Sequence, residues 1–320
     1  MSSFGTPLTS KTIKFAIPPT PKLETLGYGT GVRVFELNRC VQDGTKHSPW
    51  AIKRVNSAAG SRLKSSCKER IAKEAKILKM LDHPNIVGFR AFVQADDGRE
   101  CLAMEKCTVG LGDLILDRSE QGLGPFPVRD ILTVGLCVSR ALDYLHREKR
   151  ILHGDIKSHN VLVKGDFKEV KLCDFGVSLP LNGYGNVPRR EVYIGTELWS
   201  APEVLRGDVI TDKTDIFPFG LVLWEMMTLR MPHLPTDDSL SMDVSTVPCG
   251  QDSPRTCRSS SSCDGDSNLL CGTRPPLDRE LLGEEYATVV EVFERCTEED
   301  PSLRPSAEEL VQWLQPHARS

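Results

Sequence analysis

The 320-residue sequence lacks the features typical of nucleic-acid-binding, secreted or membrane proteins. It has no excess of positive charge, because 40 Lys and Arg residues stand against 44 Asp and Glu residues, for a formal net charge of −4. An affinity for nucleic acid or acidic membranes that rests mainly on charge is therefore not expected. No N-terminal segment has the apolar core of a signal peptide, and the longest apolar run, residues 216–227, is too short to span a bilayer and contains Glu225. We expect a soluble protein of the cytoplasm or nucleus.

The eleven cysteines lack the arrangement of a disulfide framework. Their number is odd and they are scattered over predicted strands, helices and loops, which is typical of reduced thiols. Four of them lie in a stretch rich in Ser and Asp, at positions 249, 257, 263 and 271, without a Cys-x-x-Cys pair or a neighbouring histidine. A zinc site is the minor alternative there, and we predict a disordered insertion over about 235–271.

The rest of the chain divides into a β-rich first part and a helical second part. Residues 1–21, rich in Ser, Thr and Pro, are predicted to form a disordered tail. Short β-type runs broken by Gly and Asp between Leu23 and Val55 predict a small antiparallel sheet. Apolar residues at helical spacing predict helices at 67–81, 128–149, 215–229, 284–296 and 306–314. The sequence contains no internal repeat, and its elements predict an α+β fold.

The most informative stretch runs from His153 to Asn160 and is followed by Asp174-Phe175-Gly176. β-type runs flank both segments, so Asp155, Asn160 and Asp174 can converge on one cleft from neighbouring loops. Two carboxylates and an amide in this order fit phosphoryl transfer, with Asp155 as general base and with Asn160 and Asp174 holding Mg²⁺. Lys157 would offset charge on the transferred phosphoryl group. A set of ordinary turn and capping residues is the alternative, but every polar residue agrees in type and order with the pattern expected for phosphoryl transfer.

A glycine-rich segment near the N-terminus can bring backbone N–H groups close to phosphate oxygens. Its predicted nucleotide-binding residues are Leu26, Gly27, Gly29, Gly31 and Val34. By itself the segment is equally compatible with a hairpin that binds no ligand. The third glycine falls at position 31, and Val32 stands where the kinase pattern has that glycine.

Lys53 follows this segment on a β-type run and is predicted to bind the α- and β-phosphates of ATP. Glu74, on the next helix, is its expected ion-pair partner. A lysine on a surface strand is the ordinary alternative, but a glycine-rich loop, then Ala51-Ile52-Lys53, then Glu74 is an order that chance rarely produces. Ala51, Met104 and Glu105 complete the predicted nucleotide-binding set, with Met104 beside the adenine pocket at the linker between two lobes.

From about Leu23 to Leu314 these motifs resemble the protein kinase superfamily. The resemblance implies a bilobal α+β fold, with a β-rich N-lobe at 22–105, a mostly helical C-lobe at 106–316 that contains the 235–271 insertion, and a tail at 317–320. It also implies ATP and Mg²⁺ as cofactors and proteins as substrates. Lys157, two residues after Asp155, is similar to the lysine of Ser/Thr kinases. Gly195-Thr196 is also similar to that class, in which the threonine orients the base.

Longer segments resemble the PDZ-binding kinases, a family similar to MAP kinase kinases, at 26–32, 47–51, 83–92, 153–158 and 272–276. This resemblance implies mitotic signalling, with dual specificity left open, and a cytoplasmic location with the nucleus or spindle in mitosis. The chain departs from that family in its last residues, 316–320, so PDZ binding is not predicted, and in an insertion that is not strongly acidic. A pseudokinase scaffold that binds nucleotide and partners is the rival hypothesis.

Four further residues resemble kinase positions that shape the site without reacting. Glu203 and Arg304 resemble the buried ion pair that holds the end of the activation segment. Asp215 resembles the residue that caps a central helix and supports the catalytic loop. Gly154 stands where most regulated kinases carry an arginine that pairs with an activation-loop phosphate, so weaker dependence on such phosphorylation is expected.

Several hydroxyl groups are candidates for modification. Ser178, Tyr193 and Thr196 are expected to be exposed in the activation segment. Thr6 and Thr20 each precede a proline, so an upstream proline-directed mitotic kinase is a predicted partner.

Overall fold

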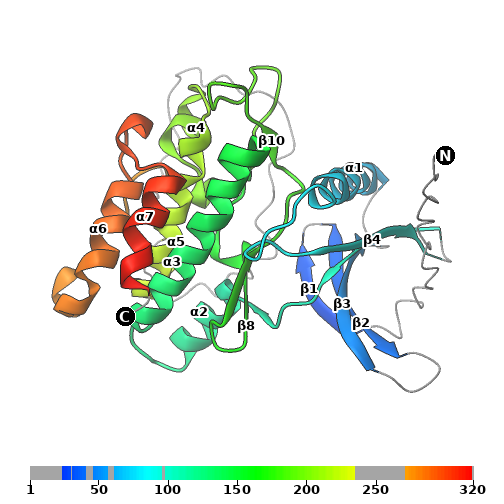
Figure 1. Cartoon of the computed structure of the whole chain (residues 1–320), viewed down its shortest axis with the longest axis horizontal. Helices are drawn as coiled ribbons and strands as arrows, with labels where there is room; N and C mark the ends of the chain where they lie inside the picture. Colours follow the sequence, from blue (N-terminus) through cyan, green and yellow to red (C-terminus); the bar gives the residue numbers. More distant parts are fainter. Residues whose placement is uncertain are drawn as a thin grey trace, which may run out of the picture.

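The computed structural model describes residues 24–29, 31–40, 46–56, 61–95, 98–234 and 271–318. The predicted tail at 1–21, with Thr6 and Thr20, and positions 235–270 of the predicted insertion lie outside the described residues. The described part forms two lobes, one built of strands with helix α1 beside them and one built mostly of helices (Figure 1). The predicted bilobal α+β fold is confirmed. Within the described ranges no helix is long and apolar enough to cross a membrane.

The N-lobe is an antiparallel sheet with the strand order β1-β2-β3-β5-β4. Its strands are β1 (Glu24–Gly29), β2 (Val32–Cys40), β3 (Lys46–Val55), β4 (Phe89–Gln94) and β5 (Glu100–Glu105). Helix α1 (Ser61–Leu78) packs on this sheet and buries the apolar face predicted for it, including Ile71, Ala75 and Leu78. The helix begins and ends earlier than the predicted range of 67–81.

The pairing register gives the sheet two different faces. Directly paired residues, and residues two apart on one strand, point to the same side. Val34 pairs with Lys53 and Ala51 pairs with Met104, so all four side chains share one face. That face also carries Val55 and belongs to the apolar core that continues into the C-lobe, whereas Trp50, Ile52 and Ala103 form a separate cluster on the other side.

The C-lobe contains helices α2 (Leu111–Glu120), α3 (Val128–Asp143), α4 (Pro202–Arg206), α5 (Ile216–Thr228), α6 (Ala287–Cys296) and α7 (Ala307–His317). A π-helical segment, Tyr144–Lys149, continues α3, and the two together fill the predicted range of 128–149. Every residue of α5 from Ile216 to Met227 is buried, which explains the long apolar run in the sequence. Helix α5 therefore forms the centre of the lobe and packs against α3 and α6, and α7 packs against α3 (Figure 1).

Two small sheets place the loops that carry the motifs. Strand β7 (Ile151–Leu152) pairs with β10 (Leu179–Pro180), and β6 (Val109–Gly110), β8 (Val161–Lys164) and β9 (Glu169–Leu172) form a second sheet. Val161 at the start of β8 pairs with Leu172 at the end of β9. Because antiparallel partners meet end to start, the residues before β8 and after β9 lie side by side.

The structure also differs from the sequence predictions elsewhere in the C-lobe. Cys271, placed in the insertion by the sequence prediction, is described and packs against the cluster around Leu198 and Trp199. Helix α7 includes His317, which was expected in the tail. Helices α2 and α4 were not predicted, since both are short and neither shows a long apolar repeat.

Candidate active site

The catalytic loop, residues 153–160, lies between β7 and β8, and the Asp215 side chain holds it by hydrogen bonds to its backbone. Asp215 Oδ2 accepts a hydrogen bond from the His153 backbone N–H at 2.8 Å, and Oδ1 accepts one from Gly154 at 2.9 Å. His146 Nε2, on the π-helical segment, lies 2.8 Å from the same Oδ2. Asp215 directly precedes α5, but its side chain makes no capping hydrogen bond to that helix. Its predicted support of the loop is present, and its predicted capping role is wrong.

Gly154 adopts a left-handed backbone conformation with φ of 78°. A residue with a Cβ atom is strained there, so glycine lets the loop turn between β7 and the base at little cost. The hydrogen bond to Asp215 holds this conformation. Loop and helix are thus fixed to each other before any ligand binds.

Asp155 lies at the end of this turn, with both carboxylate oxygens in use. Oδ1 accepts hydrogen bonds from the Thr196 hydroxyl at 2.6 Å and from the Thr196 backbone N–H at 3.2 Å. Oδ2 accepts one from Asn160 Nδ2 at 2.9 Å and lies 3.1 Å from Lys157 Nζ. Lys157 also donates to the Thr196 hydroxyl at 2.7 Å. The predicted base therefore sits in a fixed orientation among three residues that were predicted with it.

Asn160 and Asp174 meet because β8 and β9 are neighbours. The Cys173 backbone N–H donates to the Asn160 carbonyl oxygen at 3.0 Å. Asn160 uses its Nδ2 for Asp155, so its side-chain oxygen is the atom that can bind a cation. Asp174 has φ of 65°, and strain of this kind in a residue other than glycine is typical of functional sites.

Lys53 joins this loop to the N-lobe. Its Nζ lies 2.8 Å from Glu74 Oε2 on α1 and 2.8 Å from Asp174 Oδ1. Burial alone would lower the pKa of Lys53, but the carboxylates of Asp174 and Glu74 outweigh it and raise the pKa, so Lys53 stays charged. The predicted ion pair of Lys53 with Glu74 is present, and Asp174 joins it.

The two carboxylates respond differently to the shared ammonium. Burial would raise the pKa of Asp174, but the Lys53 charge outweighs this effect and lowers it to about 2. Burial raises the pKa of Glu74 to about 7, and Lys53 offsets this only in part. The Glu74 side chain is 1% exposed whereas that of Asp174 is 42% exposed. Asp174 is thus the ionised, accessible partner.

These residues fit a Mg²⁺–nucleotide site. Asn160 and Asp174 offer an amide oxygen and a carboxylate, which are the hard ligands that Mg²⁺ prefers. Among the described residues no group of three or more His, Cys, Asp or Glu side chains could hold a metal alone. Mg²⁺ sites commonly take one or two carboxylates and complete their shell with substrate phosphates and water.

The N-lobe face opposite this loop carries the remaining predicted nucleotide residues. Val34, Ala51 and Met104 share the face of Lys53, and Met104 is buried in strand β5. Gly27 and Gly29 lie on β1 opposite Val34 and Val32, and Leu26 sits at an irregularity of that strand and is 40% exposed. Gly31 has φ of 78° in the turn between β1 and β2, a conformation that requires glycine.

The linker lies one step later than predicted. Glu105 is the last residue of β5, so the connection to the C-lobe begins at Lys106. The Glu105 carboxylate accepts from the Gly88 backbone N–H at 3.1 Å and lies 3.1 Å from Lys171 Nζ. Its side chain therefore ties β5 to β9, and its backbone N–H donates to the Gly88 carbonyl oxygen at 2.8 Å.

Glu203 and Arg304 form the predicted buried ion pair. Arg304 donates from both terminal nitrogens to the two oxygens of Glu203, each at 2.8 Å, and its Nε donates to the Glu298 carbonyl oxygen at 2.7 Å. The Thr214 hydroxyl donates to the same carboxylate at 3.0 Å. Both side chains are nearly inaccessible, at 0% and 4% exposure. The pair holds α4 to the segment before α7.

The predicted exposed hydroxyls are mostly engaged. Ser178 is 1% exposed and donates to the His153 carbonyl oxygen at 2.9 Å, so the prediction of exposure is wrong. Thr196 is half-buried on Asp155, and Tyr193 is half-buried against the cluster of Leu152 and its neighbours. Sequence spacing placed these residues in one segment but could not say which way each side chain turns.

Sequence reasoning missed the role of a buried acid, Glu225, that contacts the catalytic loop. Glu225 on α5 accepts from the Ser158 hydroxyl at 2.7 Å and from Trp199 Nε1 at 2.9 Å, so it joins the catalytic loop to the end of the activation segment. Burial raises its pKa to about 7, although both hydrogen bonds favour the charged form. A lone acid inside an apolar run was the signal that could have indicated this role.

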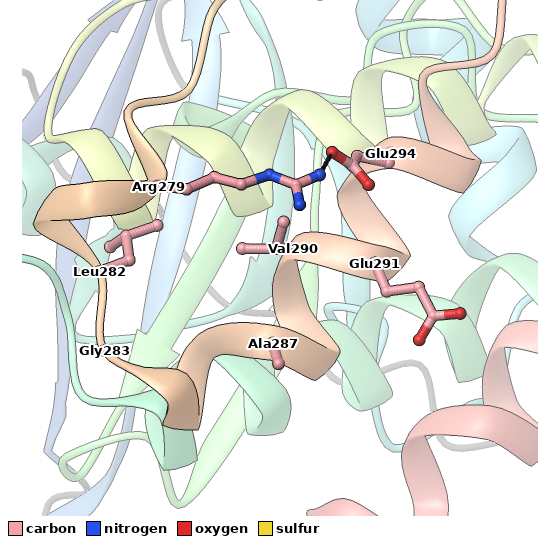
Figure 2. Close-up of a pocket in the computed structure, with 7 residues that line it drawn as sticks. All are labelled: Arg279, Leu282, Gly283, Ala287, Val290, Glu291 and Glu294. Atoms are coloured by element: carbon pink, nitrogen blue, oxygen red, sulfur yellow. Dashed lines mark hydrogen bonds and ion pairs between the residues drawn. The ribbon is translucent and has the colours of Figure 1, made fainter.

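A separate hollow on the C-lobe contains none of the predicted site residues. Figure 2 shows Arg279 and Glu294 joined by an ion pair across it, with Leu282, Ala287 and Val290 as its apolar side chains. The hollow lies between helix α6 and the segment before it. It is therefore not part of the phosphoryl-transfer site.

The chain belongs to the protein kinase family, since the model of the protein kinase domain matches residues 21–314. The lymphokine-activated killer T-cell-originated protein kinase of Homo sapiens is 48% identical over 302 residues, which cover 93% of this chain and 90% of that protein. That relative is also called PDZ-binding kinase, so the resemblance predicted from the motifs, to the PDZ-binding kinases and to MAP kinase kinases, is confirmed.

Two further relatives are similar over shorter stretches. The dual specificity mitogen-activated protein kinase kinase mek-2 of Caenorhabditis elegans is 34% identical over 209 residues, or 65% of this chain and 49% of that protein. The mitogen-activated protein kinase kinase kinase 13 of Mus musculus is 35% identical over 172 residues, or 54% and 17%.

Proposed function

We propose that this protein transfers the γ-phosphoryl group of ATP to Ser and Thr hydroxyls of protein substrates. The observation that carries the proposal is the closed set of contacts among Asp155, Lys157 and Thr196, all at 3.2 Å or less. The lysine and threonine that accompany the base in Ser/Thr kinases both contact its carboxylate here. This arrangement supports acceptance of a short aliphatic hydroxyl rather than a phenol.

Asp155 would accept the proton of the attacking hydroxyl as the new P–O bond forms. Thr196 and Asn160 keep its carboxylate aimed at that hydroxyl, since each donates to one of the two oxygens. Lys157, 3.1 Å from the carboxylate, offsets the negative charge that gathers beside it.

The cofactor would lie between this loop and the N-lobe. Asn160 and Asp174 would hold Mg²⁺, and Lys53 would bind phosphate oxygens while Glu74 keeps its ammonium in place. When bound, Mg²⁺–ATP supplies the phosphoryl group and neutralises charge on its oxygens.

The structure gives little support to a pseudokinase scaffold. Lys53, Asp155, Asn160 and Asp174 are all present. Lys53 pairs with Asp174, and Asn160 donates to Asp155. Val32 and Gly154 are the two departures that favour the rival, and neither removes a group that phosphoryl transfer needs. We therefore favour an active enzyme.

The proposal is tested with three peptides that differ only in the acceptor, Ser, Thr or Tyr. We expect ³²P transfer to Ser and Thr to exceed transfer to Tyr by at least about tenfold, a difference in transition-state free energy of about 1.4 kcal/mol. Similar rates for all three would establish dual specificity instead. An Asp155→Asn variant, which keeps the shape of the side chain but not its basicity, is the control for a contaminating kinase.

We also propose that the protein acts in mitotic signalling downstream of a proline-directed kinase. The support is the sequence of Thr6-Pro7 and Thr20-Pro21, together with the similarity to MAP kinase kinases. Mass spectrometry of protein from mitotic cells should find at least one of these threonines phosphorylated. Two unmodified sites would remove this part of the proposal.

A further inference from the structure

The activation segment contains a short stretch, Val192 to Thr196, in which exposed and inward residues alternate. Val192 and Ile194 are 71% and 40% exposed. Tyr193, between them, turns inward and packs against an apolar cluster of Leu152, Leu179, Leu181 and Val187. Leu152 ends strand β7, directly before the catalytic loop. The tyrosine therefore joins the activation segment to the root of the loop that carries the base.

The ring of Tyr193 lies beside two glycines. A Cβ atom placed on Gly195 would lie 2.4 Å from Tyr193 Cε1 and 2.6 Å from its Oη, distances at which the ring has to move. A Cβ atom on Gly154 would lie 3.8 Å from Tyr193 Cε2, in ordinary contact. The absence of a side chain at Gly195 is what makes room for the ring, whereas the space at Gly154 would admit a Cβ atom.

The packing of the Tyr193 ring involves residues adjacent in the chain to Thr196 and to the base, Asp155. Thr196 follows Gly195 in the chain, and its N–H and hydroxyl both donate to Asp155 Oδ1. Because Gly154 precedes Asp155, the ring touches the neighbours of both partners of this contact. Gly154 also means that no arginine is present here to pair with an activation-loop phosphate.

We propose that Tyr193 is a positioning residue that sets the Thr196–Asp155 contact through the packing of its ring between Gly154 and Gly195. The proposal rests on the proposed function, since it assigns to the ring the place that a phosphate–arginine pair would otherwise take. The environment agrees with a neutral ring: burial, and then the carboxylates of Asp215, Asp155 and Glu203, raise the pKa of Tyr193 well above its usual value.

The test compares kcat, KM for a Ser peptide and ATP affinity in four variants. Tyr193→Phe keeps the ring and should retain kcat within about threefold. Tyr193→Ala should lower kcat by about 10- to 100-fold at unchanged ATP affinity, because misplacement by about 1 Å can cost that much. Gly195→Ala, which adds one methyl group against the ring, should show the same loss. Tyr184→Ala, in the same segment but at a 92% exposed tyrosine, is the matched control and should behave as wild type.

A double-mutant cycle separates positioning from general stability. If Tyr193 acts through Thr196, then Tyr193→Ala should have a smaller effect on kcat in a Thr196→Ala background, which keeps only the backbone N–H contact to Asp155, than in the wild type. Independent, multiplying losses would overturn the proposal, and so would a wild-type kcat in both Tyr193→Ala and Gly195→Ala. A wild-type protein that transfers no phosphate would instead contradict the proposed function.

Discussion

Two buried ion-pair sites in this molecule use similar groups in opposite ways. Arg304 donates to both carboxylate oxygens of Glu203, and its other N–H groups donate to the carbonyl oxygens of Lys213, Glu298 and Glu299. Lys53 instead divides one positive charge between Glu74 and Asp174, and Asp174 stays accessible in a strained backbone conformation. A complete network fixes a fold, whereas a site that keeps an ionised, accessible carboxylate beside a shared ammonium can still bind a ligand. The second site is where a cation and phosphates would complete the charge balance.

The largest effect is expected when the functional site loses the ammonium group of Lys53. Lys53→Met keeps the apolar stem but not the charge, and should lower phosphoryl transfer by about 10³-fold, as loss of a key electrostatic contact does elsewhere. Steady-state ³²P kinetics measure this. Lys164→Met, which removes an exposed ion pair with Glu169, is the control and should leave the rate unchanged. A Lys53→Met rate close to wild type would contradict the assignment of the Lys53 ion pairs to function.

The structural pair should respond in stability rather than in chemistry. Arg304→Met leaves the Glu203 carboxylate buried and unpaired, so the free energy of unfolding should fall by about 3–5 kcal/mol in a urea titration. The same change at Arg206, whose partner Glu299 is exposed, should cost less than about 1 kcal/mol. Equal losses at the two arginines would show that burial does not distinguish these pairs.

Glu225 offers a pH-dependent test of how the loop is held. Burial raises its pKa to about 7 in the folded protein, above the value near 4.5 expected when unfolded, so the folded state binds the extra proton between these limits. Stability from this group is therefore present below about pH 4.5 and is lost as the pH rises through about 7. Relative to Glu225→Gln, the melting temperature of the wild type should fall as the pH increases from 5 to 8. A difference that does not change with pH would contradict this.

The smallest effect is expected at Gly154. A methyl group there would meet the Val177 carbonyl oxygen at 3.5 Å, which is ordinary contact, so the cost of Gly154→Ala comes from the backbone alone. A left-handed conformation costs a residue with a Cβ atom about 1–2 kcal/mol, which thermal unfolding can detect. Gly124→Ala, at a position with open space and no left-handed backbone, should be neutral or slightly stabilising. A stable Gly154→Ala protein would mean that the loop does not need this turn.

Much of the site could be predicted because its motifs are local and ordered along the chain. Asp155 and Asn160 lie in one loop, and strand pairing brings Asp174 to them, so residue type and spacing sufficed. The side-chain directions of Ser178 and Tyr193 could not be predicted, since each depends on which distant segment packs beside it. The same holds for Glu225, whose partners Ser158 and Trp199 come from two other parts of the chain.

The most direct test of the account is ³²P transfer from Mg²⁺–ATP to a protein substrate by folded wild type and by Asp155→Ala, with ATP binding measured in both. We predict that the wild type transfers phosphate, and that Asp155→Ala binds ATP with similar affinity but transfers none. A wild-type protein that binds ATP and transfers nothing would contradict the account, and would make a nucleotide-binding scaffold the better description.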